Sequence, residues 1–185
     1  MMSRFSQFIL KLFGWKTEGN VPRDLKKYLI VVVPHTSNWD FLLGILVRSA
    51  LRLDRVRFIG KSSLFKFPYG FIFRALGGYP VDRKKSSGYV ESVIDIFQRE
   101  DEFATTIAPE GTRGKVDRLK SGFYYIADGA KVPMILTRFD FGTKTVTLRE
   151  PFYTTGDMEA DMARINDYFR GAVGRNPQKG YLYGE

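Results

Sequence analysis

The sequence predicts an α/β fold with a mixed, mostly parallel sheet flanked by helices and with an N-terminal amphipathic helix. Short apolar runs alternate along the chain with longer segments of helical periodicity, the pattern of strands joined by covering helices. The clearest strand-like run, residues 28–34, is apolar at consecutive positions, as expected where a parallel strand is buried on both faces. With 185 residues, of which 44% are hydrophobic, the chain is long enough for one substantial core. We expect strands near residues 28–33, 55–59, 78–82, 103–107, 132–138 and 144–149.

The first predicted helix covers residues 3–13, where apolar residues recur at helical spacing and form a single stripe. Arg4 and Lys11 flank this stripe. A short basic helix with aromatic residues suits a membrane interface, where each basic residue adds about 1 kcal/mol near an anionic surface. The same stripe also fits a helix packed on its own domain. We divide the chain into a membrane-interface helix, residues 1–20, and a single domain, residues 21–185. The stripe consists of Phe5, Phe8, Ile9, Leu12 and Phe13.

The rest of the chain predicts further helices and one hairpin. The turn signal at residues 141–143 (Phe-Gly-Thr) indicates that the last two strands form an antiparallel pair. The tail from residue 174 to 185 is expected to be poorly ordered, as chain termini often are. The remaining helices are expected near residues 39–52, 67–76, 87–99, 121–129 and 157–171.

The composition favours anionic partners. The formal charge is +9, from 29 basic and 20 acidic residues, which suits lipid headgroups, an acidic carrier protein, coenzyme A or nucleic acid. The absence of cysteine excludes disulfides and thiolate nucleophiles, and a single histidine argues against zinc, so no metal is expected. No apolar run approaches the roughly 20 residues that span a bilayer, and we identify no signal peptide. We therefore expect a cytoplasmic protein.

The only histidine, His35, directly follows the most strand-like run of the chain, residues 28–34, and Asp40 stands five positions further on. Residues five apart on one helix point about 140° apart. The two side chains therefore meet only if His35 lies on the loop and Asp40 in the first turn of the next helix. A carboxylate that accepts a hydrogen bond from one imidazole nitrogen leaves the other free to take a proton. The pair is a candidate general base with its orienting acid, although a histidine at a strand end is often only a packed or surface residue.

A second polar segment, Glu110 to Arg113, also follows a strand-like run. Loops at the carboxyl ends of parallel strands share one edge of the sheet, where ligands bind, so this segment is expected to face the histidine. Gly111 permits close backbone approach or a positive φ. Thr112 offers a hydroxyl, and Arg113 offers a permanently charged planar fork that suits a phosphate. The alternative is a simple salt bridge between Glu110 and Arg113 within the loop.

Taken in this order, His35-x4-Asp40 and Glu110-Gly111-Thr112-Arg113 resemble the glycerolipid acyltransferase family, which includes the 1-acylglycerol-3-phosphate acyltransferases. Two further blocks extend the resemblance over roughly residues 28–140. The middle block has Ser62 and Ser63 where many members have an acidic residue after the lysine, and the last block lacks the usual second proline. These blocks are residues 60–65 with 77–83, and residues 120–123 with 130–135.

The resemblance implies an enzyme that moves a fatty acyl group from acyl carrier protein or coenzyme A to a hydroxyl of lysophosphatidic acid or a related lysolipid, in phospholipid biosynthesis. His35 would be the base, oriented by Asp40. We expect no acyl-enzyme, because the sequence contains neither cysteine nor a Gly-x-Ser-x-Gly elbow. The acceptor's phosphate would lie on residues 110–113, with support from Arg83 and Lys61, although both also fit a solvated basic surface.

The implied partners are the lysolipid, the thioester donor and an anionic membrane surface, with no cofactor beyond the thioester and no nucleic acid. The protein is expected as a peripheral protein on the inner face of the membrane. The aromatic segment 64–73 is a candidate acyl-chain groove, or else part of the core. Two other functions remain open. One is the same chemistry on an aminolipid or another lipid acceptor, which the altered middle block motivates. The other is a non-catalytic basic module that binds anionic lipid or nucleic acid.

Overall fold

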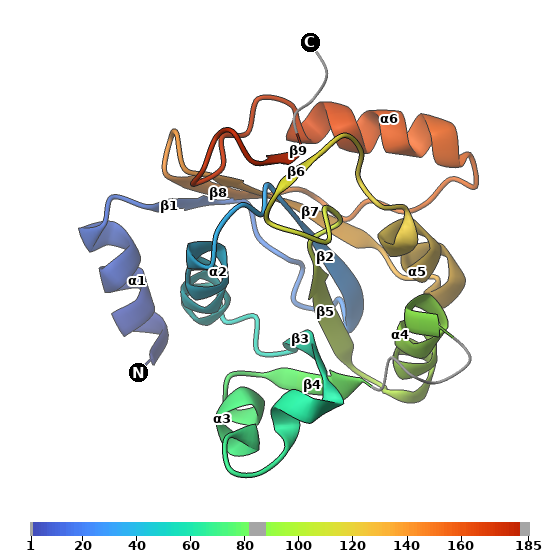
Figure 1. Cartoon of the computed structure of the whole chain (residues 1–185), viewed down its shortest axis with the longest axis horizontal. Coiled ribbons are helices and arrows are strands. Elements are labelled where there is room, and N and C mark those ends of the chain that lie inside the picture. The colour runs from blue at the N-terminus through green and yellow to red at the C-terminus, as the bar shows by residue number, and fades with distance from the viewer. Residues whose placement is uncertain (1, 82–87, 182–185) are drawn as a thin grey trace.

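The computed structural model describes residues 2–81 and 88–181. Their centre is a seven-stranded sheet (Figure 1) in the order β1-β8-β7-β2-β5-β3-β4. In this described part, neighbouring strands run parallel except for β7 and β8, which form the expected antiparallel pair. The mixed, mostly parallel sheet is confirmed. In sheet order the strands are β1 (Lys16–Glu18), β8 (Thr145–Leu148), β7 (Met134–Asp140), β2 (Lys27–Val33), β5 (Phe103–Ile107), β3 (Val56–Lys61) and β4 (Gly78–Val81).

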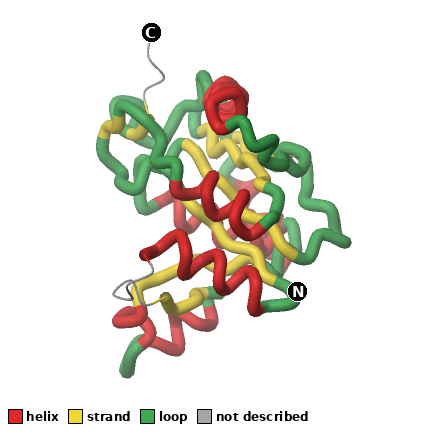
Figure 2. Tube along the Cα trace, turned by 90° about the vertical axis from the view of Figure 1, so that its right-hand side faces the viewer, coloured by secondary structure: helices red, strands yellow, loops and turns green. Residues whose placement is uncertain are grey.

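Helices cover both faces of the sheet. Figure 1 shows α1 and α2 on one side of the strands and α4 and α5 on the other. Figure 2 views the molecule from the side of α4 and α5, and helices lie in front of the strands there. The N-terminal helix is present, as predicted. Within the described residues, none of the helices combines the length and the apolarity needed to cross a bilayer. The helices are α1 (Met2–Leu12), α2 (Trp39–Ala50), the 3-10 turn η1 (Ser62–Phe65), α3 (Gly70–Ala75), α4 (Gly88–Arg99), α5 (Gly122–Ala130) and α6 (Met158–Phe169).

The central strand β2 divides its side chains between two cores. Leu29, Val31 and Val33 pack with α4, α5 and α6, whereas the alternate residues Tyr28, Ile30 and Val32 pack with α1 and α2. Successive side chains of a strand point to opposite faces, so a strand covered on both faces must be apolar at every position. This is why the run of consecutive apolar residues was a reliable strand signal.

The structure differs from the predicted elements where local pattern was weak. The strands β1, β6 (Lys115–Val116) and β9 (Gly180–Tyr181) were not predicted, because they are two or three residues long and carry no apolar pattern. The predicted helix at 67–76 begins only at Gly70. Pro68 stands just before it, and proline is not tolerated inside a helix.

The C-terminal segment also differs from its prediction. Residues 174–181 were expected to be poorly ordered, but β9 pairs in parallel with β6 to form a second, two-stranded sheet. The Gly180 N–H donates to the Gly114 carbonyl oxygen at 3.0 Å. Long-range hydrogen bonds hold this segment on the domain, and no local sequence pattern reports them. Residues 182–185 lie outside the described part.

Parallel pairing brings the two polar loops to one edge of the sheet. β2 and β5 are neighbours, with Val31 opposite Ile107. The loops that leave their carboxyl ends, residues 34–38 and 108–114, therefore emerge side by side. This is the edge at which α/β proteins bind ligands.

Candidate active site

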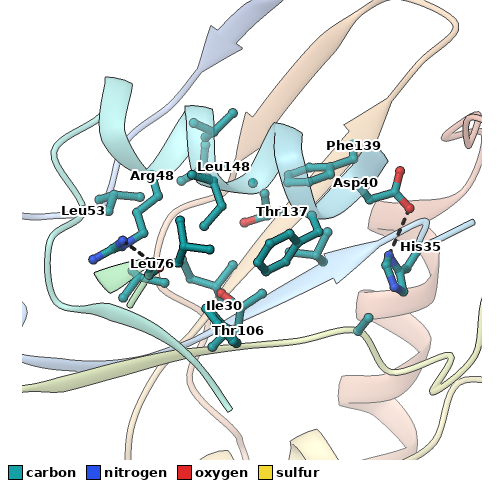
Figure 3. A pocket seen from close by; sticks show the side chains of 18 residues that line it. Ile30, His35, Asp40, Arg48, Leu53, Leu76, Thr106, Thr137, Phe139 and Leu148 are labelled. Atoms are coloured by element: carbon teal, nitrogen blue, oxygen red, sulfur yellow. Dashed lines mark hydrogen bonds and ion pairs between the residues drawn. The ribbon is translucent and has the colours of Figure 1, made fainter. Parts of the chain in front are cut away.

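His35 and Asp40 meet as the spacing predicted. His35 lies in the loop after β2, and Asp40 is in the first turn of α2. His35 Nδ1 lies 3.0 Å from Asp40 Oδ2 (Figure 3). The same carboxylate oxygen accepts the backbone N–H groups of Thr36 and Ser37, each at 2.8 Å. The carboxylate is buried and held by these backbone donors, so it can fix the imidazole with Nε2 free to accept a proton.

Glu110 binds the backbone of the loop that carries His35. Its side chain is fully buried, and its two carboxylate oxygens accept the His35 N–H at 2.9 and 3.1 Å. It also accepts the backbone N–H of Tyr181. Burial raises the pKa of the Glu110 carboxyl, against the opposing effect of the hydrogen bond from His35. Within the described residues Glu110 makes no ion pair with Arg113, so the carboxylate anchors backbone at the site.

A polar cavity opens beside the imidazole. Gly111 adopts a left-handed conformation with φ +66°, and a Cβ there would lie 2.7 Å from Lys120 Nζ. The positive φ favours glycine here, whereas the end of the flexible Lys120 side chain can shift to make room. The Thr112 hydroxyl oxygen accepts the Gly114 N–H at 3.2 Å and shapes the loop. The cavity is lined by His35, Gly111, Thr112, Arg113, Gly114 and Lys179.

An apolar cavity of about 230 Å³ opens on the other side of the histidine. It lies between α2 and the sheet, with His35 at one end and Arg48 and Leu53 at the other (Figure 3). The Arg48 guanidinium donates to the Leu76 carbonyl oxygen at 3.3 Å and so closes that end. Most of the other lining residues are aliphatic or aromatic, with Thr106 and Thr137 among the polar exceptions. They include Ile30, Val32, Phe41, Gly44, Ile45, Val47, Val56, Phe58, Phe139 and Leu148.

The expected acyl-chain segment does not line this cavity. Residues 64–73 form η1, α3 and their connection, away from α2, and several of their aromatic side chains are exposed. The sequence carried one overlooked signal, Gly44 in the interior of an otherwise apolar helix, since glycine there often has a packing or functional reason.

The predicted site residues fall into three groups. The structure brings Gly111, Thr112 and Arg113 together with His35 around the polar cavity. Glu110 is buried outside the lining of this cavity, where it accepts the His35 backbone N–H. Lys61 ends β3, but its side chain lies outside the described part of the chain, as does Arg83 entirely. Lys179 was missed by sequence reasoning, because its segment was expected to be disordered.

The comparisons with known proteins identify the family of this chain. The profile of the acyltransferase family matches residues 15–137, about two thirds of the chain. The chain belongs to the acyltransferase family. The matched range includes His35, Asp40 and the loop 110–113, whereas Lys179 lies beyond it. The resemblance to the glycerolipid acyltransferases is thereby confirmed.

Two individual proteins resemble this acyltransferase. The human 1-acyl-sn-glycerol-3-phosphate acyltransferase beta is 26% identical over 151 residues, which cover 78% of this chain and 53% of the human protein. The chain thus spans about half the length of this curated relative. The crystal structure of the 1-acyl-sn-glycerophosphate (LPA) acyltransferase PlsC from Thermotoga maritima aligns with a TM-score of 0.58 and 22% identity, over 90% of this chain and 78% of that one. This second likeness shows a shared fold.

Proposed function

We propose that the protein transfers a fatty acyl group from an acyl thioester of coenzyme A or acyl carrier protein to a hydroxyl of lysophosphatidic acid or a related lysolipid. One observation carries the proposal. The Asp40-oriented imidazole of His35 stands between an apolar cavity and a cationic polar cavity. An acyl chain and a phosphate are the two ligands that such a pair of cavities suits.

In this reaction His35 acts as general base. Nε2 takes the proton of the acceptor hydroxyl as its oxygen attacks the thioester carbonyl carbon. The tetrahedral intermediate then collapses, the carbon–sulfur bond breaks, and the imidazolium returns its proton to the departing thiolate. Asp40 stabilises the imidazolium formed between the two steps. Base catalysis of this kind is worth about 10²–10⁴-fold. The chain contains no cysteine, which supports direct attack by the acceptor.

We assign the acceptor's phosphate to the polar cavity. Gly111 allows close backbone approach, and Arg113 supplies a permanent positive charge with paired N–H donors. Lys61 and Arg83 remain proposed supporting cations, on the strength of the family resemblance. The fatty acyl chain of the donor is assigned to the apolar cavity, where its methylene groups would leave water. We place the reaction in phospholipid biosynthesis.

We further propose that α1 holds the protein on the inner face of an anionic membrane. One side of α1 packs on α2, where Leu10 is buried and the Gln7 amide donates to the Ala50 carbonyl oxygen at 3.0 Å. The other side, together with Phe13 just after the helix, leaves four large apolar side chains between 60 and 65% exposed. Aromatic residues beside basic ones suit the headgroup boundary of a bilayer. The exposed side chains are Phe5, Phe8, Leu12 and Phe13.

Thiol release from an acyl thioester tests the reaction. Purified protein is assayed with a coenzyme A or a carrier-protein donor, in the presence and absence of lysophosphatidic acid, beside the His35→Ala variant. We expect acceptor-dependent release that falls by at least about 100-fold in the variant. Full turnover in the variant would overturn the role of His35, and release that ignores the acceptor would indicate a thioesterase. A panel of neutral, amino and phosphate-bearing acceptors then identifies the preferred lipid.

A further inference from the structure

Residues 174–181 lie beyond the family match, yet they close over the residue next to the proposed base. The Asn176 backbone N–H donates to the Thr36 hydroxyl oxygen at 3.1 Å, and its side-chain amide donates to the Thr36 carbonyl oxygen at 2.8 Å. Gly174 and Gly180 press against the same threonine, since a Cβ on either would lie 2.6 or 2.9 Å from Thr36 Cγ2. This close approach requires glycine at both positions.

A second anchor joins the segment to the histidine itself. The Glu110 carboxylate accepts the backbone N–H groups of both His35 and Tyr181. One fully buried side chain therefore connects the loop that carries the base with strand β9. Segment 174–181 and the His35 loop are held together at two points, Thr36 and Glu110.

Lys179 lies between these two anchors. Its backbone N–H donates to the Asn176 carbonyl oxygen at 3.0 Å, and the next residue, Gly180, begins β9. The lysine lines the polar cavity together with His35 and Arg113. The backbone of Lys179 is thus held, through Asn176, on the loop that carries His35.

Two cationic side chains, Arg113 and Lys179, line the polar cavity. Across residues 2–81 and 88–181, neither Arg113 nor Lys179 forms an ion pair with a carboxylate. The nearby acid Glu110 is buried and occupied by backbone N–H groups. Like charges held around one cavity favour an anion there. An arginine fork and a lysine point charge can bind different oxygens of one phosphate monoester.

We propose that Lys179 is a further binding residue for the phosphate monoester of the acceptor lipid, and that Asn176 positions it. This inference rests on the proposed function. It enlarges the acceptor site beyond the loop 110–113 and gives the C-terminal segment a part in substrate recognition.

Steady-state kinetics of the Lys179→Gln variant test the proposal, with a short-chain, monomerically dispersed lysophosphatidate as acceptor. We expect the acceptor KM to rise about tenfold, the typical value of one lost hydrogen bond to a charged group. The kcat, the KM for the donor and the KM for a monoacylglycerol without phosphate should change less than about threefold. Lys26→Gln is the matched control, because Lys26 is exposed and precedes β2 at the opposite end of the sheet.

Three results would overturn the assignment. The first is an unchanged acceptor KM in Lys179→Gln. The second is an equal change in Lys26→Gln, which would reflect overall charge. The third is a rise in the donor KM alone, which would assign the lysine to a phosphate of coenzyme A. Lysophosphatidate binding measured by calorimetry on wild type and variant tests the same point without turnover. Absence of activity in the wild type would therefore refute the proposed function and leave the binding test intact.

A double-mutant cycle tests the role of Asn176. If Asn176 acts on acceptor binding through Lys179, Asn176→Ala should raise the acceptor KM in the wild type and add nothing in the Lys179→Gln background. Additive effects in the cycle would assign Asn176 to the stability of the His35 loop alone.

Discussion

Replacing Gly44 with leucine tests whether the apolar cavity holds an acyl chain. Gly44 lines the cavity from α2, and a Cβ built on it would lie 3.9 and 4.0 Å from two ring carbons of Phe139. These are ordinary van der Waals distances, so Gly44→Ala fits without strain. Gly44→Leu would extend further carbons into a space of about 230 Å³. The helix should persist, because leucine is a better helix former than glycine by up to about 1 kcal/mol.

The expected loss follows from the volume that the leucine occupies. Its side chain would displace about four carbons of a chain that fills the cavity. Each methylene that leaves water is worth about 0.8 kcal/mol, so a long-chain donor should lose about 3 kcal/mol of binding. This corresponds to roughly a 200-fold fall in kcat/KM. The alanine variant occupies one carbon position and should cost about fourfold.

The assay is kcat/KM for thioesters of increasing chain length, measured on wild type, Gly44→Ala and Gly44→Leu. Long-chain donors should lose activity in the order alanine, then leucine. Donors too short to reach Gly44 should keep the wild-type rate, which controls for a damaged active site. A chain-length preference that is the same in all three proteins would refute the assignment of the cavity. An equal loss with every donor would refute it as well.

Two further predictions concern Glu110 and α1. Burial raises the pKa of Glu110 above its usual value of 4.5. The folded state therefore binds a proton on this carboxyl more tightly than the unfolded state does. The stability that this proton contributes is lost as the pH rises from 4.5 through the raised pKa. In urea titrations, the free energy of unfolding of Glu110→Gln should therefore fall less than that of the wild type over this pH interval. Equal falls in the two proteins would contradict a raised pKa for the buried Glu110 carboxyl. In α1, Phe5→Ser with Phe8→Ser should weaken sedimentation with anionic vesicles by at least about tenfold per residue without affecting folding, because both side chains are exposed. Tyr153→Ser, at an equally exposed aromatic residue, is the control, and vesicle binding equal to wild type in the α1 variant would remove the membrane role.

The sequence by itself determined the features that depend on neighbouring residues. The consecutive apolar residues of β2 predicted a buried parallel strand, because a strand covered on both faces has no polar side. The five-residue spacing of His35 and Asp40 predicted their hydrogen bond, because a strand exit followed by a first helical turn brings these positions together. The approach of residues 110–113 to the histidine followed from the common edge of parallel strands.

Only the tertiary structure decided which distant residues complete the site. Asn176 and Thr36 are 140 positions apart, and no periodicity connects them. Lys179 becomes part of the polar cavity only because β9 pairs with β6 and Glu110 accepts the Tyr181 N–H. The apolar cavity likewise depends on how α2 packs over the sheet around Gly44. Hydrogen-bond partners and cavity walls of this kind depend on positions in space, and the local pattern of a sequence reports only the contacts that lie within one element or its turn.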